Sequence, residues 1–167
     1  LEGIFTGIEL QTKLPYWCTG PVPYVYNANF LQYVKYPFTP DVLFEDTDFV
    51  SVHLYYAKRM MYSAKCAYRI HYNTNSTTHT ITYKHVADYI FLGKRMLDFY
   101  QSLNDTTSRY AMSILEGGSY NVWMSCKKLL KLHSIQDVRA FYNRLDSLID
   151  YKTLLTYSKP SYCWTWW

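Results

Sequence analysis

Residues 67–83 read AYRIHYNTNSTTHTITY, and this stretch decides the predicted fold. Polar and apolar side chains alternate in residues 67–72 and again in residues 78–83, which is the period of a half-buried β-strand. The five residues between them, 73–77, are all Asn, Ser or Thr, residue types that favour turns. The stretch therefore predicts a β-hairpin with a five-residue loop.

The segment before the hairpin predicts one further strand. In residues 50–56, the side chains at even positions are apolar and alternate with Ser51, His53 and Tyr55. This alternation is typical of a strand with one buried face. Together with the hairpin it predicts a small, mainly antiparallel sheet.

Three later segments have helical periodicity. Residues 86–103 carry an apolar stripe that includes Gly93, a small residue that we expect to permit close packing against the sheet. Residues 122–132 carry a second stripe after a predicted turn at residues 117–118, and residues 135–150 carry a third. We expect these three helices to cover one face of the sheet in an α+β fold.

The last of these helices has a start signal of its own. Ser134 precedes it, and Asp137 follows three positions later. This spacing is that of a capping box, in which the two side chains satisfy free N–H groups at a helix start. The signal predicts that the helix begins at residue 135.

The first 40 residues are rich in proline and aromatic residues. They contain five of the six prolines, at positions 15, 21, 23, 37 and 40. Because proline fixes φ and lacks an N–H donor, this composition disfavours helices. We predict an extended arm over residues 1–40 and an α+β body over residues 41–167, together forming a single domain over residues 1–167.

The overall composition is that of a chain that folds, with 49% hydrophobic and 18% charged residues. The chain has 19 tyrosines, and tyrosine suits both half-buried core positions and interfaces, so composition leaves both open. Apolar runs such as residues 89–92 are far shorter than the roughly 20 residues that cross a bilayer. No transmembrane segment is predicted, and no compartment is indicated.

The four cysteines lie at positions 18, 66, 126 and 163, at least 37 residues apart. This spacing does not match the paired Cys-x2-Cys pattern of zinc sites. We therefore predict no cysteine metal site and no cofactor. Free thiols and disulfides both remain open.

Asp46 and Asp48 form a D-x-D pattern inside residues 42–50. Two carboxylates at this spacing can hold a divalent cation for phosphoryl transfer. The stretch resembles the D-T-D motif of family-B DNA polymerases, except that Phe49 stands where those enzymes have Ser, and more loosely the D-x-D of nucleotide-sugar glycosyltransferases. The resemblance implies a metal-dependent phosphoryl-transfer enzyme. The other interpretation is a non-catalytic acidic turn, exposed to solvent, before the strand at residues 50–56.

Charge is unevenly distributed along the chain. Residues 1–50 have two basic and six acidic residues, a net charge of −4, whereas residues 51–136 have eleven and four, a net charge of +7. Within residues 55–95 basic side chains lie among tyrosines, a combination that stacks bases and neutralises phosphates. A solvated basic face explains the same residues. Nucleic-acid binding thus remains open for Lys58, Arg59, Arg69, Lys84, Lys94 and Arg95.

Aromatic residues are concentrated towards both ends of the chain. Tyrosine and tryptophan are frequent interface anchors, and a large exposed apolar patch is rare on a monomer. We therefore predict a non-catalytic structural or protein-interaction subunit of a larger homo- or hetero-oligomeric assembly. The predicted partner-binding residues are Tyr16, Trp17, Tyr24, Tyr26, Tyr162, Trp164, Trp166 and Trp167.

Overall fold

The computed structural model describes residues 3–13, 24–65, 68–69, 71, 73, 76, 82–134, 136–138 and 140–141. Within these residues the chain forms several helices and one small antiparallel sheet of two strands, so it combines helices and strands as an α+β chain does. Contacts divide the chain into two compact units, residues 1–76 (the N-terminal unit) and residues 77–167 (the C-terminal unit). None of the helices described is long and apolar enough to cross a membrane.

The N-terminal unit contains three helices and both strands. In chain order they are β1 (Ile4–Phe5), α1 (Gly7–Lys13), α2 (Ala28–Val34), α3 (Asp46–Tyr56) and β2 (Met60–Met61). The two strands pair antiparallel, with Ile4 opposite Met61 and Phe5 opposite Met60. The Gly7 N–H continues this contact by donating to the Ala57 carbonyl at 2.8 Å.

Helix α3 is the centre of the N-terminal unit. Every residue from Asp48 to Leu54 is buried, and Val50 has no exposed surface. Helix α1 packs directly on the end of α3 at Gly7, where an added Cβ would lie 2.0 Å from the Leu54 carbonyl oxygen. This approach of two backbones admits no side chain at position 7.

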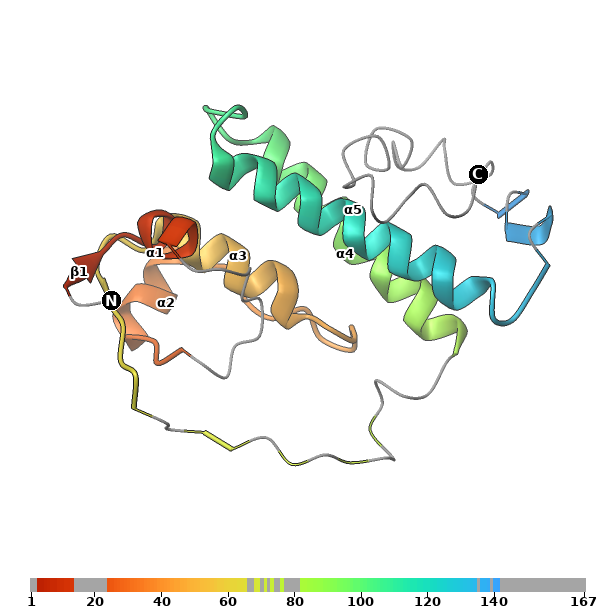
Figure 1. The fold of residues 1–167 in the computed structure, drawn as a ribbon, viewed down its shortest axis with the longest axis horizontal. Helices are drawn as coiled ribbons and strands as arrows, with labels where there is room; N and C mark the ends of the chain where they lie inside the picture. Colours follow the sequence, from red (N-terminus) through yellow and green to blue (C-terminus); the bar gives the residue numbers. More distant parts are fainter. Residues whose placement is uncertain are drawn as a thin grey trace. The chain divides into compact units, whose positions relative to one another are not determined.

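The C-terminal unit is built on a pair of long helices, α4 (Tyr83–Gln101) and α5 (Arg109–Leu129). Figure 1 shows them side by side, running in opposite directions along most of their length. Each buries one apolar stripe against the other, and Leu92, Ile114 and Leu115 have no exposed surface. Val138, just beyond α5, joins the same core.

The predicted strand at residues 50–56 is wrong, because this segment lies in helix α3. Ser51 and His53, two of its alternating residues, are buried too, and they bond along the helix. The Ser51 hydroxyl donates to the Thr47 carbonyl at 2.8 Å, and His53 Nδ1 donates to the Phe49 carbonyl at 2.8 Å. A helix whose polar side chains bond mainly along its own backbone can be buried all round, and it then shows no helical stripe.

The predicted hairpin is not found among the described residues. Tyr68, Arg69 and His71 have no strand conformation, and Tyr83 opens helix α4 instead of ending a strand. Residues 67, 70, 72, 74–75 and 77–81, which include most of the second strand, lie outside the described residues. The sheet that three helices were expected to cover is therefore not confirmed.

The helix predicted at residues 86–103 is confirmed as α4. The turn predicted at residues 117–118 is wrong, because α5 runs through it and includes much of the helix predicted at 122–132. Glycine is used there for packing, since a Cβ at Gly117 would lie 2.6 Å from Cε of Met96 on α4. Gly93 likewise packs against α5 and not against a sheet, because its added Cβ would lie 2.8 Å from Cγ2 of Val122.

The capping box at Ser134 and Asp137 is confirmed. The Ser134 hydroxyl donates to Asp137 Oδ2 at 2.7 Å, and the Asp137 N–H donates to Ser134 Oγ at 3.3 Å. Residues 136–138 and 140–141 are helical. The rest of the helix predicted at 135–150 lies outside the described residues.

The prediction of an extended arm over residues 1–40 is wrong for α1 and α2. The prolines lie outside these helices, because three of them follow α1, which ends at Lys13, and two follow α2, which ends at Val34. Asn27 caps α2 by accepting from the N–H groups of Asn29 and Phe30 at 2.9 and 3.2 Å, as a helix start needs. Residues 14–23 lie outside the described residues, and the single domain over residues 1–167 stays a prediction.

Candidate functional site

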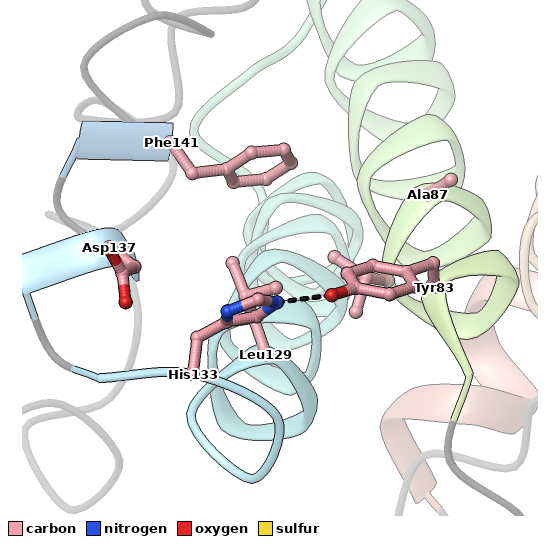
Figure 2. Close-up of a pocket in the computed structure, with 7 residues that line it drawn as sticks. Tyr83, Ala87, Leu129, His133, Asp137 and Phe141 are labelled. Atoms are coloured by element: carbon pink, nitrogen blue, oxygen red, sulfur yellow. Dashed lines mark hydrogen bonds between the residues drawn. The ribbon is translucent and has the colours of Figure 1, made fainter.

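A groove lies in the C-terminal unit where the start of α4 meets the end of α5. Its volume is about 370 Å³, and Phe141 closes one side of it opposite Ala87, as Figure 2 shows. Leu129 forms part of the floor. Cavities of this size accept small apolar groups or single large side chains. The lining residues are Tyr83, Val86, Ala87, Leu129, His133, Asp137 and Phe141.

Three polar side chains edge this groove. Tyr83 and His133 share a hydrogen bond between the tyrosine hydroxyl and the imidazole Nε2, and their ring centroids are 5.5 Å apart. The side-chain hydrogen bond from Ser134 lowers the pKa of Asp137, and the Ser134 backbone N–H and nearby His133 lower it further. The groove therefore combines apolar walls with a hydrogen-bonding rim and an ionised carboxylate.

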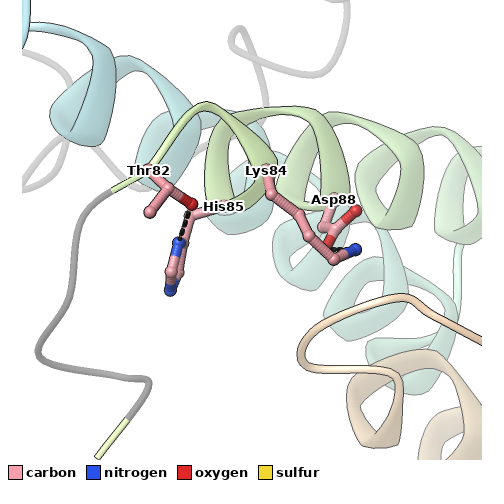
Figure 3. Close-up of polar contacts among 4 residues, drawn as sticks. All are labelled: Thr82, Lys84, His85 and Asp88. Carbon is pink, nitrogen blue, oxygen red and sulfur yellow. Dashed lines mark hydrogen bonds and ion pairs between the residues drawn. The ribbon is translucent and has the colours of Figure 1, made fainter.

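Polar contacts also hold the first turn of α4 (Figure 3). The Thr82 hydroxyl bonds to His85 Nδ1 at 2.8 Å, so it does not cap the helix. Lys84 Nζ lies 2.8 Å from Asp88 Oδ2 in an ion pair whose carboxylate is 10% exposed. Lys84, a predicted nucleic-acid contact, is thus engaged within its own helix.

The other predicted nucleic-acid contacts are divided between the units. Lys58, Arg59 and Arg69 are exposed in the N-terminal unit. On α4, Lys94 pairs with Asp98 at 2.5 Å, and the guanidinium of Arg95 lies 5.7 Å from the centre of the Phe91 ring. Neither unit contains the whole set.

A second basic cluster, on α5, was not predicted as a site. Lys127 Nζ lies 5.0 Å from the centre of the Trp123 ring, which in turn lies 5.6 Å from the Tyr120 ring. Burial lowers the pKa of Lys128, and the nearby charges of Lys131 and Lys127 lower it further. The lysine spacing was visible in the sequence, but the stacking of Lys127 on Trp123 required knowing that 120–127 is one helix.

Asp46 and Asp48 lie in the first turn of α3 and not in a turn before a strand. Asp48 is 2% exposed, and it accepts hydrogen bonds from the Tyr36 hydroxyl at 2.8 Å and the Phe49 N–H at 2.9 Å. Burial raises the pKa of Asp46, with smaller raising effects from Glu45 and Asp48. In the part of the chain that the structure describes, no group of three or more His, Cys, Asp or Glu side chains could hold a metal ion.

A buried histidine in the N-terminal unit was not predicted as a site at all. His53 is 2% exposed, and four rings surround its imidazole: Phe49 at 4.0 Å, Phe30 at 5.7 Å, Tyr26 at 5.9 Å and Tyr36 at 6.5 Å between centroids. We call these five residues the His53 cluster. Because Nδ1 donates to the Phe49 carbonyl, Nε2 carries the lone pair, and it is buried without a hydrogen-bond partner.

The predicted partner-binding residues fall into two groups. Tyr24 and Tyr26 are half-buried in the N-terminal unit, where the Tyr24 hydroxyl accepts a hydrogen bond from Gln11 at 2.9 Å and the Tyr26 ring lies 5.7 Å from that of Phe49. The others lie outside the described residues: Tyr16, Trp17, Tyr162, Trp164, Trp166 and Trp167. Of the cysteines, Cys126 is half-buried on α5, and the other three also lie outside the described residues.

Comparison with known proteins finds no match: no protein-family model fits this chain, and neither a curated protein nor a solved structure is significantly similar to it.

Proposed function

We propose that this chain is a non-catalytic structural or protein-interaction subunit that docks on other protein subunits through its aromatic terminal segments. The observation that carries the proposal is the exposure of large apolar side chains in the N-terminal unit. Ile4 and Met61, opposite each other across the two strands, are 57% and 79% exposed. Tyr33 on α2 is 74% exposed. Side chains of this kind gain most by burial against a partner.

The groove in the C-terminal unit supports the same proposal. Its floor and walls at Val86, Leu129 and Phe141 are apolar, and its rim offers hydrogen bonds from Tyr83 and His133. Interface pockets that receive an anchor residue combine an apolar interior with a polar rim in this way.

Removal of residues 162–167 tests the proposal. Because interface anchors such as Trp164, Trp166 and Trp167 often contribute about 2 kcal/mol or more each, we expect the shortened chain to associate at least tenfold more weakly. Light scattering after size-exclusion chromatography measures the mass of the assembly, and Thr165→Ala is the matched control that keeps all three tryptophans. A full-length chain that is monomeric and binds no protein partner would contradict the proposal.

A second candidate is nucleic-acid binding, which the stacking of Lys127 on Trp123 favours. An aromatic ring beside lysines is the arrangement that holds a base and its phosphate. We expect the anisotropy of a labelled single-stranded oligonucleotide to rise when the protein is added and to fall again as the salt concentration rises. We expect the Lys127→Glu variant to bind the oligonucleotide several-fold more weakly. Lys35→Glu in the N-terminal unit is the control, and unchanged binding by Lys127→Glu would exclude this surface.

A further inference from the structure

The His53 cluster holds a titratable group where a charge is costly. His53 is 2% exposed, and among the described residues its ring contacts four aromatic rings: Tyr26 before α2, Phe30 on α2, Tyr36 after α2 and Phe49 on α3. The ring of Phe38 stacks on that of Phe49, with the ring centroids 3.9 Å apart. An imidazolium in such a place loses its hydration without gaining an anion.

The polar surroundings of His53 favour the neutral imidazole. Nδ1–H is fixed on the Phe49 carbonyl, and the buried Nε2 has no hydrogen-bond partner that could receive a proton from it. The titratable groups that face the ring are the hydroxyls of Tyr26 and Tyr36, and the Tyr36 hydroxyl donates to Asp48. No Lys, Arg or Glu has a ring contact or hydrogen bond with His53 among the residues described.

We propose that His53 is an acid-sensitive switch of the N-terminal unit: a proton gained at Nε2 opens the aromatic cluster and releases Tyr26 and Tyr36 from the core. Protonation turns Nε2 into a donor that needs a partner or water, and Nε2 has no hydrogen-bond partner where it is buried. Opening the cluster hydrates the imidazolium and exposes aromatic side chains next to α3. That the released tyrosines then contact a partner rests on the proposed function, whereas the opening itself does not.

The direction of the pH effect follows from the burial of the imidazole. Burial lowers the pKa of His53, and the hydrogen bond to the Phe49 carbonyl raises it by less. In the unfolded chain the imidazole binds a proton below its ordinary pKa of about 6.5. Between the pKa of the folded state and that of the unfolded state, the unfolded chain binds more protons than the folded one. The stabilisation that neutral His53 gives the N-terminal unit is therefore complete above about pH 6.5, and it is lost as the pH falls through the pKa of the folded state.

Hydrogen exchange of the full chain, read by mass spectrometry at pH 7.5 and 5.5, tests this switch. After correction for intrinsic exchange rates, we expect protection of residues 46–56 to fall by up to about tenfold, the limit set by one pH unit below the unfolded-state pKa of about 6.5. Peptides of α4 and α5 in the same sample are the internal reference, and their protection should change less than twofold. Equal protection of residues 46–56 at both pH values overturns the proposal.

Two variants and a matched control assign the effect to one side chain. His53→Gln keeps a donor for the Phe49 carbonyl, His53→Phe keeps the ring packing, and neither titrates, so both should lose most of the acid response. His85→Gln removes a histidine that is also buried, at 3% exposure, but bonded to Thr82, and it should leave the response of residues 46–56 intact. An unchanged response in the His53 variants contradicts the proposal.

Should both variants fail to fold, an NMR titration of the wild-type chain tests the switch. His53 must titrate with a pKa below 6.5, and a pKa at or above 6.5 overturns the switch.

Discussion

The two units of this protein bury their helices in different ways. In the C-terminal unit, α4 and α5 each keep a solvent face, as the exposure of Phe91 at 41% and Tyr120 at 44% shows, and bury one stripe. In the N-terminal unit, α3 is buried on every side from Asp48 to Leu54. An apolar stripe at helical spacing is visible in the sequence only where a helix has one face exposed to solvent. The periodicity of the sequence therefore predicted α4 correctly, but it predicted a strand where α3 lies.

The largest expected effect concerns the contact that buries α3. In Gly7→Ala, the new Cβ would lie 2.0 Å from the Leu54 carbonyl oxygen and 2.7 Å from its carbon. Backbone cannot move aside as a flexible side chain can, so α1 must separate from α3. We expect the N-terminal unit to lose about 3 kcal/mol, because overpacking against fixed atoms costs this much. Urea denaturation followed by hydrogen exchange of residues 46–56 measures the loss.

Lys13→Ala on the same helix is the control for this change. Lys13 is exposed, and substitutions at exposed positions usually stay within about 0.5 kcal/mol of the wild type. If Gly7→Ala were as stable as the control, α1 would not pack on α3 as described, and the contrast between the two units would lose its basis.

The sequence predicted the parts of the fold that local chemistry determines. Two features were predicted from residues close together in the sequence. They are the helix whose apolar stripe lies in residues 86–103 and the capping box of Ser134 and Asp137. The burial of α3 depends instead on Phe30, Phe38 and the other rings that reach it from distant positions. The argument from proline failed for a related reason. It treated residues 1–40 as one segment, although α1 fits before the first proline and α2 fits between the third and the fourth.

The candidate sites were predictable to an even smaller degree. The groove depends on Tyr83 and His133, which are 50 residues apart and meet because α4 and α5 are antiparallel. His53 carried no sequence motif, and its surroundings come from α2, from the segments on either side of α2 and from α3 itself. Asp48 was noticed for its spacing from Asp46, yet its environment is set by Tyr36, a residue that no carboxylate motif includes.

A smaller effect is expected for the glycines between α4 and α5, where a paired comparison sharpens the contrast. In Gly93→Ala, the Cβ would lie 2.8 Å from Cγ2 of Val122, a side chain with no exposed surface, and 3.1 Å from the Gly118 carbonyl oxygen. In Gly117→Ala it would meet only the far end of Met96, with Cε at 2.6 Å. At both positions alanine stabilises the helix by about 1 kcal/mol relative to glycine. At position 93 this gain only partly offsets the clash with Val122, whereas at position 117 it exceeds the cost of moving the flexible end of Met96. We therefore expect Gly93→Ala to destabilise the C-terminal unit by about 1 kcal/mol and Gly117→Ala to be neutral or slightly stabilising. Urea denaturation read by exchange of residues 109–129 distinguishes them, and equal stabilities would show that α4 and α5 can separate slightly at Gly93, as α1 and α3 cannot at Gly7.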